Sequence, residues 1–237
     1  MDETVELIGR RVENRQFTQH VVVNVAKLVN AQSDPQLADS VRACDIVNID
    51  GMGVVWGARI LGFAVPERVA GVDLFQRLLA FAAQRDLPVF LLGAKPEIVE
   101  AVARRCADAN PGLRIAGFHH GYFWENEREI VEHIRASGAR LLFVAITSPK
   151  KENFINRWRG DLGVDFVMGV GGTFDVVADK VKRAPLWMQR AGLEWLYRVV
   201  QEPRRMWRRY LVTNSKFALM LGRAWFQRRF SEAKRAS

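Results

Sequence analysis

The chain has few cysteines and no long apolar run. Its 237 residues include two cysteines, Cys44 and Cys106, which stand far apart and match no metal-binding or redox spacing. This usage predicts no disulfide framework and is typical of a reducing cytoplasm. The opening stretch MDETVELIGRR has no apolar h-region, so we expect no signal peptide. No stretch approaches the roughly 20 apolar residues that a membrane-spanning helix needs, so none is expected.

Residue patterns that hold a metal ion are also scarce. His119 and His120 are adjacent, and in an extended segment adjacent side chains point to opposite faces. No cysteine or paired histidine lies nearby, and no aspartate-x-aspartate pair is present to hold a metal on a nucleotide-sugar diphosphate. A structural role is therefore favoured for both histidines over a metal site, and no cofactor is expected.

Positive charge is plentiful but unevenly distributed. The formal net charge is +9. Residues 180–237 contain 15 Lys or Arg and 3 Asp or Glu, whereas residues 1–179 contain 20 and 23. The basic segment also holds four of the seven tryptophans. Basic and aromatic residues together predict an anionic partner, which is a phosphate, a nucleic acid or an acidic membrane surface.

Apolar periodicity predicts an α/β fold. Short, continuously apolar stretches alternate with stretches of helical spacing, and the former lie at residues 20–24, 45–50, 87–93, 113–118, 139–146 and 164–172. This alternation predicts a Rossmann-like, mostly parallel sheet with helices on both faces. We expect an α/β core over residues 1–179 and a basic helical appendage over residues 180–237.

Several polar residues and glycines follow the predicted strands. In parallel sheets the ligand crevice lies at the carboxyl ends of the strands. The residues that fall there are Asn24, Asp50, Gly93, the turn at 148–152 and the stretch 169–175. Their convergence predicts a single active site.

Asp50 has two interpretations. An apolar surround raises the pKa of a carboxylate toward the range of a general base. The alternative is an N-cap for the helix that follows Gly51, which is a common position for aspartate. Spacing alone favours the N-cap.

The stretch GVGGTF at residues 169–174 also has two interpretations. Its backbone N–H groups can cradle a phosphate, or it can be a tight turn. It is not a dinucleotide fingerprint, because Phe174 stands where a third glycine is needed and the stretch follows the last strand. A Rossmann dehydrogenase is therefore disfavoured.

Three arginines mark the basic segment. Arg198, Arg205 and Arg208 would lie within about 80° of one face if one helix carried them all, and three guanidiniums there suit a diphosphate. Pro203 lies between the first two and can split that helix. The alternatives are a solvated basic face or a nucleic-acid-binding module, although no helix-turn-helix or RNA-stacking signature is present. Beyond Tyr210, apolar and basic residues alternate in a pattern typical of a membrane interface.

Several stretches together resemble the WecG/TagA/CpsF family of glycosyltransferases, glycosyltransferase family 26. In chain order they are NIDGMGVVW, PERVAGVDL, VFLLG, NPGLRIAG, GYF, SPKKE, GVGGTFD, RAPLWMQRAGLEWLYR and EPRRMWRRY. They run from about residue 20 to about residue 210, and the ordered set is specific although no single motif is decisive.

The resemblance implies an inverting, metal-independent transferase with the GT-E fold at the cytoplasmic face of the membrane. Such an enzyme moves a sugar from a UDP-sugar to a polyprenyl-diphosphate-linked saccharide, and its C-terminal appendage closes over the site. Asp50 then matches the proposed base that deprotonates the acceptor hydroxyl. The substrate-binding residues implied by the matched motifs are Asn24, Arg68, Lys150, Lys151, Glu152, Gly171, Gly172, Asp175, Arg183, Arg198, Arg205 and Arg208.

Two positions depart from the family pattern. Val22 stands where a threonine is usual, and Lys151 stands where a glutamine is usual. A lysine adds charge where an amide is expected, so the donor sugar stays open between N-acetylmannosamine and glucose or another hexose, as in exopolysaccharide assembly. The expected partners are the UDP-sugar, the polyprenyl-diphosphate-linked acceptor and an anionic membrane surface. No nucleic acid is expected, and a homo-oligomer is left open.

Overall fold

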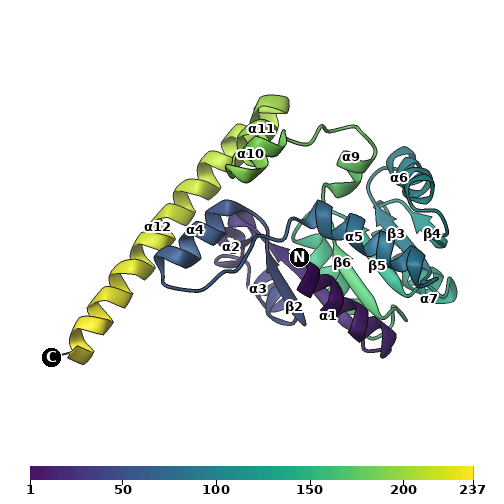
Figure 1. Ribbon diagram of the computed structural model, residues 1–237, viewed down its shortest axis with the longest axis horizontal. Coiled ribbons are helices and arrows are strands. Elements are labelled where there is room, and N and C mark those ends of the chain that lie inside the picture. The colour runs from purple at the N-terminus through teal and green to yellow at the C-terminus, as the bar shows by residue number, and fades with distance from the viewer. Residues whose placement is uncertain (237) are drawn as a thin grey trace. The chain divides into compact units, whose positions relative to one another are not determined.

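A computed structural model describes the backbone of residues 1–236, and their side chains except those of Arg205 and residues 229–236 (Figure 1). The chain forms two compact units that are interleaved along the sequence. Unit 1 comprises Met1–Val22, Gln36–Asn48 and Val69–Lys182. Unit 2 comprises Val23–Pro35, Ile49–Arg68 and Arg183–Ser237, and so joins two early segments to the basic C-terminal segment. The division at residue 179 into a catalytic core and an appendage stays a prediction.

Unit 1 is built on a parallel sheet, which in the described chain has six strands (Figure 1). The strands are β1 (Thr18–Val23), β2 (Ile46–Ile49), β3 (Val89–Gly93), β4 (Ile115–His119), β5 (Leu141–Ala145) and β6 (Phe166–Gly169), in the order β2-β1-β6-β5-β3-β4. Central strands β3 and β5 are buried along their whole length. Burial on both faces explains why these strands are continuously apolar in sequence. The predicted α/β class is confirmed.

Helices cover both faces of the sheet. On one face lie α1 (Asp2–Glu13), α5 (Gly71–Gln84) and α6 (Pro96–Ala109), which pack in one apolar cluster with Leu91 and Phe143. On the other face α7 (Glu127–Ala136) and α8 (Lys150–Trp158) pack with Phe90 and Val144. Neighbours along a strand, such as Phe90 and Leu91, thus enter opposite clusters, as a side-chain period of two requires. Unit 1 also contains helix α9 (Thr173–Val177) and, apart from its first residue, helix α3 (Pro35–Arg42).

Aromatic packing fills the first cluster. The ring of Phe143 meets Phe75 edge to face, with centroids 4.8 Å apart, and lies 6.3 Å from Phe166. All three side chains are fully buried. Such pairs stabilise a fold by about 0.5–1.5 kcal/mol beyond the burial of their area.

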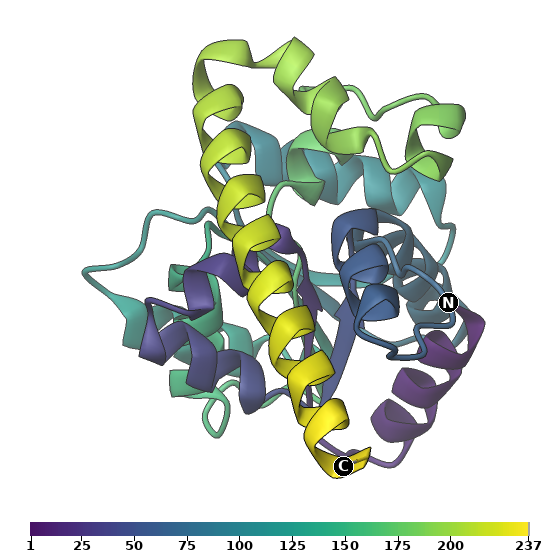
Figure 2. The ribbon, with the colours of Figure 1, turned by 90° about the vertical axis from the view of Figure 1, so that its left-hand side faces the viewer.

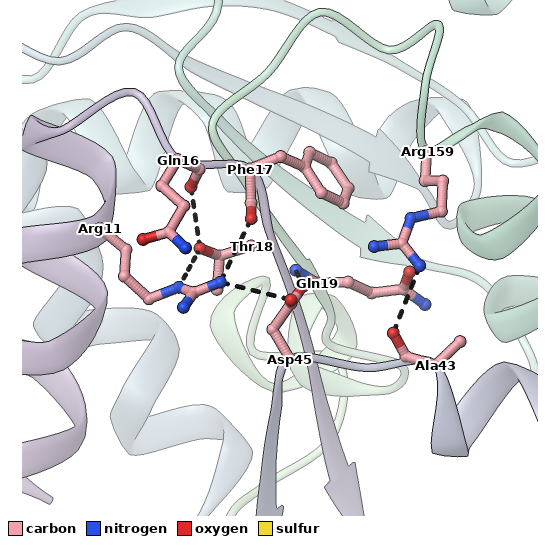
Figure 3. A network of polar contacts seen from close by, with 8 residues as sticks. All are labelled: Arg11, Gln16, Phe17, Thr18, Gln19, Ala43, Asp45 and Arg159. Atoms are coloured by element: carbon pink, nitrogen blue, oxygen red, sulfur yellow. Dashed lines mark hydrogen bonds and ion pairs between the residues drawn. The ribbon is translucent and has the colours of Figure 1, made fainter.

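Polar contacts hold the amino ends of β1 and β2 together (Figure 3). Asp45 accepts the Gln19 backbone N–H at 2.8 Å, and its second oxygen lies 3.3 Å from the Arg11 guanidinium. Arg11 also donates to the Thr18 hydroxyl at 2.7 Å. This network joins α1 to two strands, so it helps to fix how β1 and β2 pair at this edge.

Unit 2 is helical. Its helices are α2 (Val25–Ala31), α4 (Met52–Ile60), α10 (Leu186–Arg190), α11 (Glu194–Gln201) and α12 (Pro203–Ala236). Helix α12 is one long helix that contacts α2 and α11 (Figure 2). A Cβ on Gly57 of α4 would lie 2.9 Å from the ring of Phe217, so glycine allows α4 and α12 to approach closely. Of the helices in the described chain, none combines the length and apolar character needed to cross a bilayer.

Candidate active site

Asp50 follows β2 and does not cap the next helix. The N-cap position of α4 belongs to Gly51, whose φ of 113° favours glycine, and no side chain caps this helix. The backbone N–H of Asp50 donates to the Val23 carbonyl at 2.9 Å. The N-cap interpretation is therefore wrong, and the side chain of Asp50 is half-buried.

Asn24 lies beside this segment and has a structural role. Its side-chain oxygen accepts the Lys27 backbone N–H at 3.0 Å and so caps α2. A Cβ placed on Gly51 would lie 3.7 Å from the Asn24 Cβ, which puts the two strand-end segments next to each other. Substrate contact by Asn24 stays a prediction.

Tyr210, on α12, lies among charged groups that include Asp50. Burial raises the pKa of the Tyr210 phenol above its ordinary value of 10. The guanidiniums of Arg198 and Arg209 lower this pKa, whereas the carboxylates of Asp50 and Glu194 raise it. These Coulombic interactions indicate that all four charged side chains lie near the phenol. The phenol stays protonated at neutral pH and can donate a hydrogen bond there.

Two arginines expected to bind substrate converge on one carboxylate. Arg68 forms an ion pair through Nη1 with Oε2 of Glu194. The Nε atom of Arg183 lies 3.8 Å from Oε1 of the same side chain. Glu194 was not predicted as a site residue, because its ion-pair partner Arg68 lies 126 positions away in sequence. The available signal was an acidic residue in a segment that is otherwise strongly basic.

The appendage arginines do not share one helix. Helix α11 ends before Pro203, which begins α12, so Arg198 lies on a different helix from Arg205 and Arg208. Proline removes a backbone donor and disfavours the helical conformation of the residue before it, which explains the break. The expected single face of three arginines is therefore wrong. Arg198 is half-buried and Arg208 is exposed, while the side chain of Arg205 lies outside the described residues.

A buried ion pair follows β5 in unit 1. Lys151 Nζ lies 2.5 Å from Glu152 Oε1, and the side chains are 6% and 3% exposed. The lysine stem crosses Gly169 at the end of β6, where a Cβ would lie 2.5 Å from Lys151 Cδ. The ammonium of Lys151, which stands in place of the usual glutamine, is thus paired with the adjacent carboxylate and shielded from water. Lys150 instead places its ammonium 4.8 Å from the centre of the Trp124 ring.

The glycine-rich stretch forms a tight turn into a short helix. Gly171 has a φ of 54°, and Gly172 precedes the five-residue α9. The Thr173 hydroxyl donates to the Val170 carbonyl at 2.8 Å and closes the turn. Asp175 lies on α9 and is half-buried. Phosphate binding by this stretch and substrate contact by Asp175 stay predictions.

The adjacent histidines contact each other. His119 Nδ1 lies 2.9 Å from the His120 carbonyl oxygen, and the two ring centroids are 4.2 Å apart. Among the described side chains, no group of three His, Cys, Asp or Glu residues is placed to hold a metal ion.

Comparison with known proteins assigns the family. The model of the glycosyl transferase WecG/TagA/CpsF family matches residues 1–231. The chain belongs to this family. One similar protein is the N-acetylglucosaminyldiphosphoundecaprenol N-acetyl-beta-D-mannosaminyltransferase of Bacillus spizizenii, which is 37% identical over 181 residues. That alignment covers 76% of this chain and 70% of the relative. The WecG/TagA/CpsF resemblance is confirmed, and the chain is a glycosyltransferase.

Proposed function

We propose that this WecG/TagA/CpsF family member transfers a hexose from a UDP-sugar to a polyprenyl-diphosphate-linked saccharide, with inversion and without a metal ion. The observation that carries the proposal is the position of Asp50. It stands at a strand end without capping α4, and it lies near the charged groups around Tyr210. The name of the Bacillus relative supports a lipid-diphosphate-linked acceptor.

Asp50 is the general base in this proposal. A sugar hydroxyl is a poor nucleophile until a base removes its proton during attack. The acceptor oxygen attacks the anomeric carbon on the face opposite the departing UDP, and the proton passes to the Asp50 carboxylate. One bond forms as the carbon–oxygen bond to UDP breaks, so a single displacement inverts the anomeric centre.

Arginines stabilise the leaving group. The diphosphate gains negative charge as UDP departs, and positioned guanidiniums offset that charge through short, charge-assisted hydrogen bonds. Arg198 lies in the charged cluster with Asp50, and Arg68 and Arg183 meet at Glu194. Arg205, Arg208, Lys150, Lys151 and Glu152 are further substrate-binding candidates.

The donor sugar is proposed from two observations. The Bacillus relative is named for N-acetylmannosaminyl transfer, which makes UDP-N-acetylmannosamine the first donor to test. Lys151 is buried and its ammonium is paired with Glu152, so it does not present an unpaired charge to the donor sugar. UDP-glucose is the second donor, because lysine still replaces an amide.

The outer face of α12 supports action at an anionic membrane surface. Trp207, Leu211 and Leu219 are exposed on this helix, and Arg208 and Arg223 are exposed among them. Large apolar side chains interspersed with basic ones favour binding in the interfacial region of a bilayer. This location brings the enzyme to a lipid-linked acceptor at the cytoplasmic face.

A panel of UDP-sugars tests the proposed reaction. Each donor is incubated with a short-chain polyprenyl-diphosphate-linked N-acetylglucosamine, UDP release is measured, and the anomeric configuration of the product is read by NMR. We expect acceptor-dependent UDP release from one UDP-hexose, an inverted product and no loss of rate in EDTA. Acceptor-dependent release from no donor would contradict the transfer. A rate lost in EDTA and restored by Mg²⁺ or Mn²⁺ would contradict metal independence.

A further inference from the structure

Glu194 joins two segments of unit 2 that are distant in sequence. It is the first residue of α11, and its two carboxylate oxygens face different guanidiniums. Arg68 follows α4, and Arg183 precedes α10. The side chains of Arg68, Arg183 and Glu194 are 15%, 26% and 28% exposed, so the cluster is largely shielded from water. Shielding reduces the solvent screening that weakens ion pairs on an open surface.

The chemistry of the cluster suits an anion. A guanidinium carries five N–H donors in a planar fork, so one carboxylate does not exhaust the donors of either arginine. Two guanidiniums near each other repel when no anion lies between them. The Glu194 carboxylate offsets that repulsion, orients Arg68 through a direct hydrogen bond and lies within ion-pair distance of Arg183.

Glu194 also belongs to the charged group around Tyr210. The carboxylates of Glu194 and Asp50 raise the pKa of that phenol, and the Arg198 guanidinium lowers it. The carboxylates of Glu194 and of the proposed base, Asp50, therefore both lie within Coulombic reach of the Tyr210 phenol in unit 2. The negative charge of Glu194 reduces the net positive charge of the cluster. The cluster therefore favours a ligand that is bound by directional hydrogen bonds over one that is bound by electrostatic attraction alone.

We propose that Glu194 is a positioning residue that holds Arg68 and Arg183 as a paired fork for the diphosphate of a UDP-sugar. This assignment rests on the function proposed above. A purely structural role would make Glu194 a tie between α11 and the segment after α4, with no effect on nucleotide affinity once the protein is folded.

UDP binding by the full-length protein separates the two roles, using calorimetry with UDP alone as the probe. Glu194→Gln removes the charge and keeps the shape of the side chain, and Glu194→Asp keeps the charge on a shorter stem. Glu127→Gln is the matched control, because Glu127 accepts from Arg157 at 2.9 Å and from the Trp158 indole at 2.8 Å in unit 1. All variants are first compared by circular dichroism.

We expect Glu194→Gln to weaken UDP binding by about ten-fold or more, the scale of a hydrogen bond to a charged group. Glu194→Asp should give an intermediate Kd, and Glu127→Gln should stay within about two-fold of the wild type. With the preferred donor, KM should rise more than kcat falls, because the fork holds the diphosphate before and during transfer.

Three outcomes are decisive. Unchanged UDP binding in a folded Glu194→Gln protein overturns the positioning role and leaves the transferase proposal intact. A Glu194→Gln protein that fails to fold, together with wild-type UDP affinity in Glu194→Asp, assigns Glu194 a structural role and also overturns it. Absence of UDP binding by the wild type contradicts the proposed donor class itself, and the positioning role with it.

Discussion

The two units differ in where their large apolar side chains lie. Among the described residues, the largest fully buried side chains all belong to unit 1, and they include Phe75, Phe143 and Phe166. Unit 2 instead exposes large apolar groups on its helices, such as Trp187 and Trp207. Buried apolar area stabilises a fold, whereas exposed apolar patches beside charged residues mark binding surfaces. The comparison assigns stability to unit 1 and accords with the proposal that unit 2 contacts substrate and membrane.

The largest expected effect on stability contrasts two aromatic residues. Phe143→Ala should lower the free energy of unfolding by about 3–5 kcal/mol, because it removes a fully buried ring and leaves a cavity. Trp207→Ala should change it by less than about 0.5 kcal/mol, because this side chain is 54% exposed. Urea unfolding measures both. Trp207→Ala should instead reduce cosedimentation with anionic liposomes. An equal loss of stability in the two variants would contradict the difference between the two units.

Two glycines give the next contrast. A Cβ on Gly93, where φ is 124°, would lie 2.4 Å from the Ala145 carbonyl oxygen, so Gly93→Ala forces backbone movement in the sheet. We expect a loss of about 3 kcal/mol in the free energy of unfolding. The Cβ of Gly57→Ala would lie 2.9 Å from the ring of Phe217 and 3.6 Å from Leu221, which are side chains and not backbone, and alanine gains helix propensity, so the loss should be smaller, at about 1 kcal/mol. Thermal unfolding of both variants tests this order, which a larger loss in Gly57→Ala would reverse.

Disrupting the polar network at the amino ends of β1 and β2 should reduce stability moderately. Asp45→Asn weakens the ion pair with Arg11 and the bond to the Gln19 N–H, so we expect a loss of about 1–3 kcal/mol in stability. The kcat/KM of this variant should match that of the wild type, because the network belongs to unit 1 and to the scaffold. A large fall in kcat/KM with unchanged stability would assign Asp45 to the chemistry instead.

The smallest expected effect is on the pH dependence of stability, through a buried thiol in unit 1. Burial raises the pKa of the Cys106 thiol from 9.0 to about 12. Because the folded-state pKa is the higher one, the neutral thiol stabilises the fold fully below pH 9, and this contribution is lost as the pH rises toward 12. Between pH 8 and pH 10 the wild type should lose about 1 kcal/mol more than Cys106→Ala in urea unfolding. Parallel pH profiles of the two proteins would show that the thiol is not the group responsible.

The sheet could be predicted from the sequence because its inner strands β3, β5 and β6 are buried on both faces and therefore appear as continuous apolar runs. Helix α1 is not among the predicted elements, although its acidic first turn and its apolar spacing at Val5, Ile8 and Val12 are typical of a helix. The position of Asp50 could not be resolved by spacing, because the φ of Gly51 decides which residue occupies the cap. Pro203 allowed either a kink or a break, and the structure has a break.

The candidate site was predictable in its residue types and less so in its arrangement. The strand-end aspartate and the arginines follow from sequence motifs, but the meeting of Arg68 and Arg183 at Glu194 depends on tertiary packing. Tyr210 lies within the matched motif EPRRMWRRY but is not among the predicted site residues, because its interaction with Asp50 arises only when α12 packs in unit 2. Long-range pairing of single charges leaves no periodic signal.

Turnover by Asp50→Asn tests the central claim, that unit 2 carries the catalytic base. Asparagine keeps the shape of the side chain and cannot accept the proton at neutral pH. We expect kcat to fall by about 10²-fold or more, with unchanged UDP affinity and thermal stability. Asp39→Asn, which changes an exposed carboxylate paired with Arg42, is the control and should keep full activity. Turnover of Asp50→Asn near the wild-type rate would contradict the assignment of Asp50 as the base.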